Sequence, residues 1–467
     1  MKNSLFKSCP FSKLTVWFLL IIMLWTFISI EKWGKAETKQ KLIAWDVTSY
    51  YCYLPALFIH HDLTLNFTKR GKDKSYEENH QYWYQVAPNG SRVIKFTLGM
   101  AVMYAPFFLI AHIWANTFGY TANGFSIPYE FFIALSSLVY LFIGLLYLRK
   151  TLLLYFNEII TGITLLSIVL GTNLYYYTSS EPAMSHAYSF AVVSIFVFNV
   201  IKWHSSPTLL RSVLIGFLFG LIVLIRPVNI LIAVFPMLFA ITSLKTAKAK
   251  ISLLWTNRKF ILIMAFTAFL VFLPQLIYWK YLTGEWFFYS YMEEHFYFNN
   301  SHVWLGLFSF RNGWLIYSPI IIFSIIGILY TKKVNSGFFL PLVIFSILNI
   351  FVCYSWWTWW YGGSFGSRPM IDSYALLAIP MATLFERVFY KSKVAFATLF
   401  LILAVLISLN LFQSFQRRTG IIHWDSMTAK AYQIVFLKTE LSNQDIIELE
   451  KSLYHPDYDQ AKAGLDE

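Results

Sequence analysis

Charged residues are scarce in this chain. Asp, Glu, Lys and Arg make up 13% of its 467 residues, whereas 57% are hydrophobic and 20% are aromatic. Apolar runs of roughly 20 residues, the length at which a helix crosses a bilayer, recur throughout the sequence. A soluble protein is therefore excluded, and the sequence predicts an all-α polytopic membrane protein.

Cysteines and the common nucleotide-binding motifs are also lacking. The three cysteines, Cys9, Cys52 and Cys353, are too few and too far apart to form a disulfide framework. The chain has no P-loop, no G-x-S-x-G elbow and no Rossmann fingerprint. A cytosolic nucleotide donor therefore has no recognisable binding site.

The first apolar run, residues 14–30, follows Lys2, Lys7 and Lys13 and resembles a signal peptide at first sight. No small-x-small cleavage site follows it, so we expect an uncleaved first helix. By the same length criterion, about eleven spanning helices are predicted, at residues 14–30, 129–148, 159–177, 184–201, 212–225, 228–244, 260–281, 314–330, 338–354, 370–389 and 395–412.

Basic residues predict the orientation of these helices, because Lys and Arg concentrate in cytoplasmic connections. With a cytoplasmic N-terminus, most basic clusters, such as Arg149 and Lys150, fall inside, whereas the short outer connections carry only Arg226, Arg311 and Arg368. The sequence thus predicts a multi-pass plasma (inner) membrane protein. This asymmetry also explains the net charge of +13 without a nucleic-acid partner.

Residues 98–114 are apolar enough to cross, but the connection after them, 115–128, contains no Lys or Arg. A crossing here would place most later basic clusters outside. We therefore expect an interfacial or re-entrant helix within one large extracytoplasmic loop, residues 31–128. The predicted domains are a transmembrane domain over residues 1–412 and a polar extracytoplasmic tail over residues 413–467.

The two short helices predicted at 212–225 and 228–244 meet at Arg226 and Pro227. Proline stops the first helix, because it lacks an N–H and clashes with the preceding turn. An arginine at such a break does not easily face lipid, so we expect Arg226 to point into a polar cavity.

A polar stretch in the first loop, WDVTSYYCYLPALFIHHD at residues 45–62, combines Asp46 with Tyr50 and Tyr51. A carboxylate there can accept a proton from an attacking hydroxyl, with the tyrosines contacting the substrate. The alternative is that Asp46 caps a helix. Glu181, in TSSEPAMSH beside His186, has the same two interpretations. Asp46 and Glu181 are the candidate catalytic residues, and His186 is a candidate substrate contact.

The three outer arginines, Arg226, Arg311 and Arg368, are candidates for binding a lipid phosphate, because guanidinium groups bind phosphate oxygens bidentately. The alternative is that they snorkel to lipid headgroups.

The segment WWTWWYGGSFGSRP offers glycines that let a ligand approach the backbone, Gly363 among them. Its tryptophans, including Trp360, suit stacking on a sugar face; the alternative is an interfacial aromatic belt. A cation site is a weaker hypothesis. Its possible ligands, which have no tight spacing, are His60, His61, His186, Asp46, Asp62 and Glu181. No metal ligand is therefore assigned, although a divalent cation remains possible.

Several of these features together resemble the GT-C glycosyltransferases: an acid just after the first helix, a long first outer loop, and a short helical pair joined by Arg-Pro. The nearest branches are the protein O-mannosyltransferase-like enzymes and the bacterial RgtA/B/C/D-like domains. The motifs WDVTSYYCYLPALF, SEPAMSHAYSF, LIRPVNILI and WWYGGSFGSRP also resemble a group of uncharacterised bacterial members of that superfamily. The resemblance covers roughly residues 14–412.

This resemblance implies a polyprenyl-phosphate-linked sugar donor and transfer on the outer face. Asp46 would act as a base or as a metal partner, and Arg226 or Arg368 would stabilise the leaving phosphate. The mannosyltransferase branch has paired acids in its first loop, whereas Val47 follows Asp46 here.

The predicted function is therefore an inverting glycosyltransferase, a hexosyl- or pentosyltransferase with a glycan, lipid or protein acceptor. The alternatives are a transporter or flippase of lipid-linked glycans, or a non-catalytic envelope assembly protein. A transporter predicts inverted repeats and charges at mid-membrane, and the sequence has neither feature.

Overall fold

The computed structural model describes residues 10–35, 41–68 and 82–465; Lys2, Lys7 and Cys9 lie outside these ranges. The regular secondary structure of the described residues is almost entirely helical, as predicted, with one hairpin of β1 (Tyr84–Val86) and β2 (Arg92–Ile94). Seven helices in the described ranges are long and apolar enough to cross a membrane: α1 (Phe11–Ile30), α4 (Gly99–Phe118), α5 (Ile127–Leu152), α8 (His186–Ser205), α12 (Arg258–Thr283), α16 (Ser336–Tyr354) and α18 (Lys393–Arg418). The chain is therefore a multi-pass membrane protein.

Shorter helices complete the bundle. The apolar ones are α6 (Glu158–Leu170), α9 (Leu209–Ile225) and the pair η3 (Pro227–Ala233) and α10 (Val234–Leu238). The others are η2 (Lys32–Lys35), α2 (Asp46–Tyr51), α3 (Tyr53–Phe58), α7 (Leu174–Ser179), α11 (Leu244–Thr256), α13 (Val303–Phe308), α14 (Trp314–Tyr317), η4 (Pro319–Ile321), α15 (Ile322–Val334), η5 (Arg368–Ser373), α17 (Tyr374–Lys391), α19 (Ala429–Val435), α20 (Asn443–Glu450) and α21 (Tyr458–Lys462).

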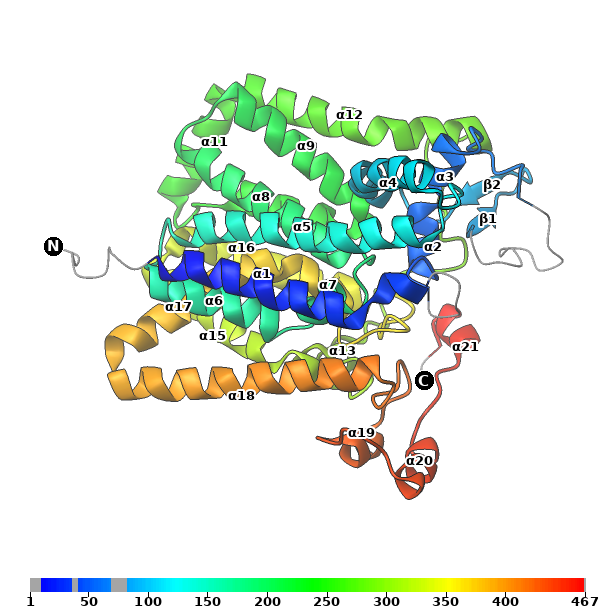
Figure 1. Cartoon of the computed structure of the whole chain (residues 1–467). Helices are drawn as coiled ribbons and strands as arrows, with labels where there is room; N and C mark the ends of the chain where they lie inside the picture. Colours follow the sequence, from blue (N-terminus) through cyan, green and yellow to red (C-terminus); the bar gives the residue numbers. More distant parts are fainter. Residues whose placement is uncertain (1–9, 36–40, 69–81, 466–467) are drawn as a thin grey trace.

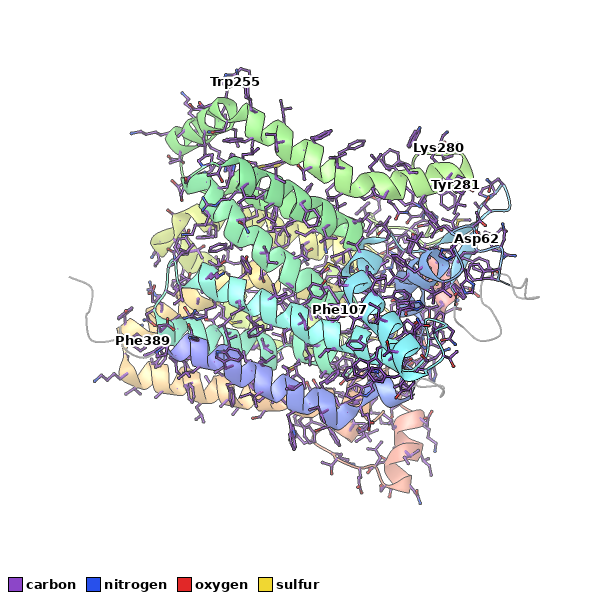
Figure 2. The ribbon with its side chains drawn as sticks, turned by 45° about the horizontal axis from the view of Figure 1, so that its top comes forward. Asp62, Phe107, Trp255, Lys280, Tyr281 and Phe389 are labelled. Atoms are coloured by element: carbon purple, nitrogen blue, oxygen red, sulfur yellow. The ribbon has the colours of Figure 1, made fainter. Side chains whose placement is uncertain are left out.

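The long helices run alongside one another, so the bundle has two distinct ends (Figure 1). The first loop, with α2, α3 and the β-hairpin, gathers at one end together with α21. We call this the cavity end. Lys280, Tyr281 and Asp62 lie there, whereas Trp255 and Phe389 lie at the opposite end (Figure 2).

Four predicted helices are discontinuous in the structure, among them the segment at 370–389, which begins as the 3-10 helix η5 before α17. The segment predicted at 159–177 divides into α6 and α7 around Gly171, and the segment at 314–330 divides at Pro319. The prediction of one continuous helix over 228–244 is wrong, because a 3-10 helix begins at Pro227 and α10 ends at Leu238. Proline has no N–H to donate, which favours such breaks. The number of eleven crossings stays a prediction.

Helix α4 occupies the segment for which an interfacial or re-entrant helix is predicted. Its start meets the end of α9, where the Thr97 hydroxyl donates to the Leu224 carbonyl at 2.6 Å. Near its other end, His112 Nδ1 lies 2.5 Å from the Tyr129 hydroxyl at the start of α5. Both contacts are with helix termini that face the cavity end, but α4 is also long and apolar enough to span a membrane, so the interfacial or re-entrant assignment stays a prediction.

Close backbone contacts fix the helices that surround the cavity. A Cβ atom added to Gly99 would lie 2.3 Å from the backbone nitrogen of Ile225, and one added to Gly216 would lie 2.3 Å from the Met264 carbonyl oxygen. Small residues allow membrane helices to pack this closely. Glycine therefore places α4 against the end of α9, and α9 against α12, beside Arg226.

Candidate active site

The cavity end encloses a hollow of about 910 Å³, a size typical of small-molecule sites. Segments far apart in the sequence line it: the first loop, the α9–η3 junction, the loop after α12, the tryptophan-rich segment and α21. Its ionisable lining includes Asp46, Lys95, His186, Arg226, Glu294, Arg368 and Lys462. The remaining lining is largely aromatic or apolar and includes Tyr50, Trp83, Ile225, Val228, Phe272, Trp279, Phe287, Phe288, Tyr291, Trp356 and Trp357.

Asp46 begins α2, and its carboxylate faces Arg368. Arg368 Nη2 donates to Asp46 Oδ2 at 2.9 Å. Trp45, rather than Asp46, occupies the N-cap position of α2. Asp46 therefore does not cap this helix. The side chains of Asp46 and Arg368 are 22% and 19% exposed. Both charges are therefore partly desolvated and still reachable from the cavity.

Arg226 is held by a second carboxylate that the sequence analysis missed. Arg226 Nη1 lies 3.0 Å from Oδ2 of Asp372, which also accepts a hydrogen bond from Asn229 Nδ2 at 2.9 Å. His186 Nδ1 lies 3.5 Å from Asp372 Oδ1. Asp372 stands four residues after Arg368, and an acid so close to an Arg-Pro motif in an apolar region was the available signal.

Lys95 and Glu294 form a further ion pair at the cavity, with 2.6 Å between Nζ and Oε1. Lys95 Nζ also lies 4.9 Å from the centroid of the Trp83 ring. Burial and the nearby Glu294 carboxylate raise the pKa of Tyr289, another lining residue, to about 12. The Tyr289 hydroxyl is therefore protonated at neutral pH and donates to the backbone carbonyl of Glu294.

Five of the residues singled out in the sequence come together at this cavity: Asp46, Tyr50, His186, Arg226 and Arg368. The other five lie outside its lining, namely Tyr51, Glu181, Arg311, Trp360 and Gly363.

The five residues outside the cavity lining have different environments. Tyr51 is buried and donates to the Gly124 carbonyl at 2.5 Å. Glu181 lies 3.9 Å from Lys32. Arg311 lies over the Trp360 ring at 5.2 Å and donates to the Tyr454 carbonyl at 2.8 Å.

Trp360 itself is buried and lines a smaller hollow next to the cavity. Gly363 is separated from the cavity by its neighbour Gly362, which does line it. The tryptophan-rich segment lies between the two hollows, since Trp356 and Trp357 line both of them.

The possible cation ligands named in the sequence do not assemble into a site. His60 stacks on Phe67 with 3.8 Å between ring centroids, and Asp62 accepts hydrogen bonds from the backbone of Thr64 and Asn66. Asp46 is paired with a guanidinium group. Within the described residues, the single cluster with a metal-ligand arrangement is His423, Asp425 and His455 in the C-terminal segment. No step is assigned to a metal at the cavity.

The fold has a counterpart among solved structures. The crystal structure of the apo oligosaccharyltransferase of Archaeoglobus fulgidus is similar over 98% of this chain, with a TM-score of 0.53 and 13% sequence identity. This chain covers 61% of the length of that enzyme. The likeness confirms the predicted fold, a GT-C-like helical membrane scaffold. No family model and no curated protein matches the sequence.

Proposed function

We propose that this chain is an inverting glycosyltransferase that moves a sugar from a polyprenyl-phosphate donor to an acceptor hydroxyl. The observation that carries the proposal is the convergence of Asp46, Arg226 and Arg368 on one cavity with aromatic walls. A glycosyl-transfer function is also in keeping with the GT-C-like scaffold. The sugar and the acceptor, whether glycan, lipid or protein, are left open.

The cavity lining matches a donor with a charged head and an apolar tail. Arg226 and Arg368 supply two guanidinium groups, whose planar donor arrangement suits phosphate oxygens. The apolar wall made by Ile225, Val228 and Phe272 suits an isoprenoid chain. Trp356 and Tyr291, whose ring centroids lie 5.5 Å apart, supply aromatic faces for a sugar ring.

The proposed reaction uses Asp46 as the general base. Its carboxylate accepts the proton of the acceptor hydroxyl as the acceptor oxygen forms a bond to the anomeric carbon. The bond between that carbon and the phosphate oxygen breaks, and the polyprenyl phosphate leaves with the electron pair. Arg368 turns from Asp46 to the phosphate when the donor binds, which frees the base and stabilises the developing charge.

We further propose that the cavity end is extracytoplasmic. Arg149 and Lys150 lie in the last turn of α5, and Lys332 and Lys333 lie in the last turn of α15. Both helices end at the opposite end of the bundle (Figure 1). Such clusters mark the cytoplasmic side. Transfer would then take place on the outer face of the plasma membrane.

Substitution of the base tests the proposal. In lipid-reconstituted protein screened with polyprenyl-phosphate sugars, Asp46→Asn should lower transfer at least about 100-fold, the usual contribution of a general base. Asp62→Asn, which changes another aspartate of the first loop outside the cavity lining, is the matched control and should retain activity. Unchanged transfer by a folded Asp46→Asn protein would reject the role of Asp46. Protein-dependent movement of intact lipid-linked glycan with no bond change would favour the transporter alternative.

A further inference from the structure

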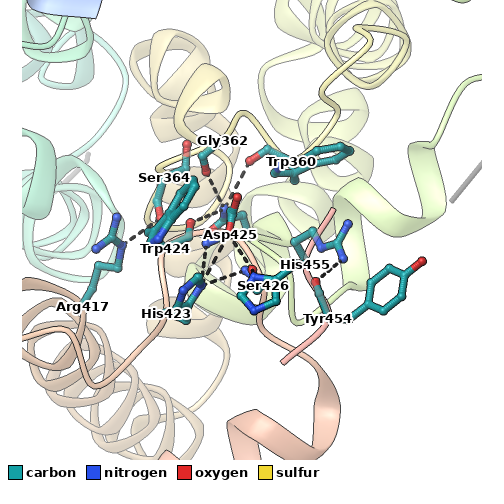
Figure 3. Close-up of polar contacts among 12 residues, drawn as sticks. Trp360, Gly362, Ser364, Arg417, His423, Trp424, Asp425, Ser426, Tyr454 and His455 are labelled. Carbon is teal, nitrogen blue, oxygen red and sulfur yellow. Dashed lines mark hydrogen bonds and ion pairs between the residues drawn. The ribbon is translucent and has the colours of Figure 1, made fainter. Parts of the chain in front are cut away.

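A second polar cluster lies outside the cavity, in the C-terminal segment (Figure 3). His423, Asp425 and His455 each offer one ligand atom, and the three atoms lie within 4.8 Å of one another. His423 Nδ1 is 3.4 Å from Asp425 Oδ1. The Ser426 hydroxyl lies between Asp425 and His455: it donates to Asp425 Oδ1 at 2.6 Å and lies 3.0 Å from His455 Nδ1.

The surroundings of Asp425 suit a cation. Asp425 is almost completely buried, at 2% exposure. Its carboxylate accepts hydrogen bonds from the hydroxyl groups of Ser426 and Tyr458. The imidazole groups of His423 and His455 lie beside it, and no Lys or Arg forms an ion pair with it among the described residues.

Two imidazoles and one carboxylate are the ligands that divalent transition metals, and Zn²⁺ in particular, bind at neutral pH. With bonds of about 2.0–2.2 Å, neighbouring ligand atoms of a tetrahedral ion stand a little over about 3 Å apart. The separation between His423 and Asp425 already agrees with this geometry. His455 is exposed, so its ring is free to turn toward the ion.

We propose that His423, Asp425 and His455 bind a divalent transition-metal ion of the Zn²⁺ class. The ion would lie among these three ligand atoms, and the Ser426 hydroxyl, which now lies between Asp425 and His455, would move aside. It would join the segment after α18 to the segment before α21, which are about thirty residues apart in the chain. A water molecule or another ligand would complete the coordination.

The position of this site connects it to the cavity wall. The Tyr458 hydroxyl donates to Asp425 Oδ2 at 2.6 Å, and Tyr458 and Lys462 of α21 both line the cavity. Neighbouring contacts hold the same region: Asn312 Nδ2 donates to the Trp424 carbonyl at 3.2 Å. A bound ion would therefore fasten α21 against the cavity, whatever reaction takes place there.

Metal binding by the full-length protein tests the site. The protein, purified without a polyhistidine tag and treated with a chelator, is dialysed against Zn²⁺ alone and the bound metal is measured. We expect about one tightly bound equivalent that His455→Asn loses. His61→Asn, which changes an exposed histidine of the first loop to a residue that tolerates its left-handed backbone, should retain it. Because His455 is exposed, its replacement should leave the fold intact.

A second measurement separates the metal from a plain hydrogen-bond network. Zn²⁺ should increase the hydrogen-exchange protection of residues 455–462 in the unmodified protein and in His61→Asn, and leave it unchanged in His455→Asn and Asp425→Asn. Absence of tight Zn²⁺ binding by the unmodified protein would overturn the proposal. So would equal binding by His455→Asn, because the ion would then be held elsewhere.

Discussion

At the residue scale, Asp372 is the polar group on which the arrangement of the cavity most depends. It is buried and contacts Arg226, Asn229 and His186. Removing one partner of a buried ion pair leaves the other charge uncompensated, which typically costs about 3–5 kcal/mol. Asp372→Ala should therefore unfold at a clearly lower temperature in detergent, whereas Asp62→Ala should unfold close to the original temperature. Equal unfolding temperatures for the two variants would show that Asp372 does not hold Arg226.

Residue-level prediction succeeded where a charge stands out against an apolar background. Asp46, Arg226 and Arg368 are conspicuous in the sequence because charges near membrane depth are costly, and the structure brings all three to the cavity. Pairings were not predictable. Arg226 and Asp372 are 146 residues apart, and Lys95 and Glu294 are 199 apart, so a single sequence holds no local signal that joins them.

At the scale of elements, the contact between α4 and α9 controls where Arg226 lies. The Cβ of an alanine at position 99 would lie 2.3 Å from the Ile225 nitrogen, so Gly99→Ala forces the helices apart. Overpacking of this kind costs about 1–3 kcal/mol. We expect a lower unfolding temperature together with weaker donor binding.

Gly363→Ala is the control for that change, because its Cβ would meet its nearest neighbour, the Trp424 ring, at an ordinary 3.8 Å. Its unfolding temperature should match that of the unmodified protein. If Gly99→Ala were equally stable, the close packing of α4 on α9 would be refuted.

The C-terminal segment gives a pH prediction. Since the folded chain holds the pKa of Asp425 below its ordinary value of 3.8, ionised Asp425 contributes stability above that value. The contribution is lost as the pH falls through the lowered pKa. Cleavage of the segment by pepsin should therefore rise steeply only below about pH 4. Asp425→Asn should be cleaved readily and without that steep rise. The same pH profile for Asp425→Asn and the unmodified protein would show that ionised Asp425 does not stabilise the segment.

Helices could be located from the sequence where the apolar run is long. The long helices α1, α5, α8 and α12 were found from sequence because about 20 apolar residues are needed to cross a bilayer. The 3-10 segments η3, η4 and η5 were not found, although each begins with or contains a proline near its start. Whether a proline kinks a helix or ends it depends on tertiary partners, such as Asp372 for the segment after Arg226.

At the scale of the whole molecule, the helical membrane scaffold and its GT-C-like fold were predicted from sequence and are confirmed. The scaffold places a cavity with charged and aromatic walls at one end of the bundle, and the opposite end carries the basic clusters. A transporter would instead be expected to hold its ionisable binding site near the middle of the bundle.

The most direct test of the central proposal is photo-crosslinking with a polyprenyl phosphate that carries a photoreactive group near its head. We predict labelling of cavity-lining segments, at residues 225–228 and 287–291, with clearly less labelling in Arg226→Gln and Arg368→Gln. Arg311→Gln, which changes an arginine outside the lining, should label like the unmodified protein. Labelling spread over the outer faces of the long helices, and unaffected by Arg226→Gln or Arg368→Gln, would contradict the account.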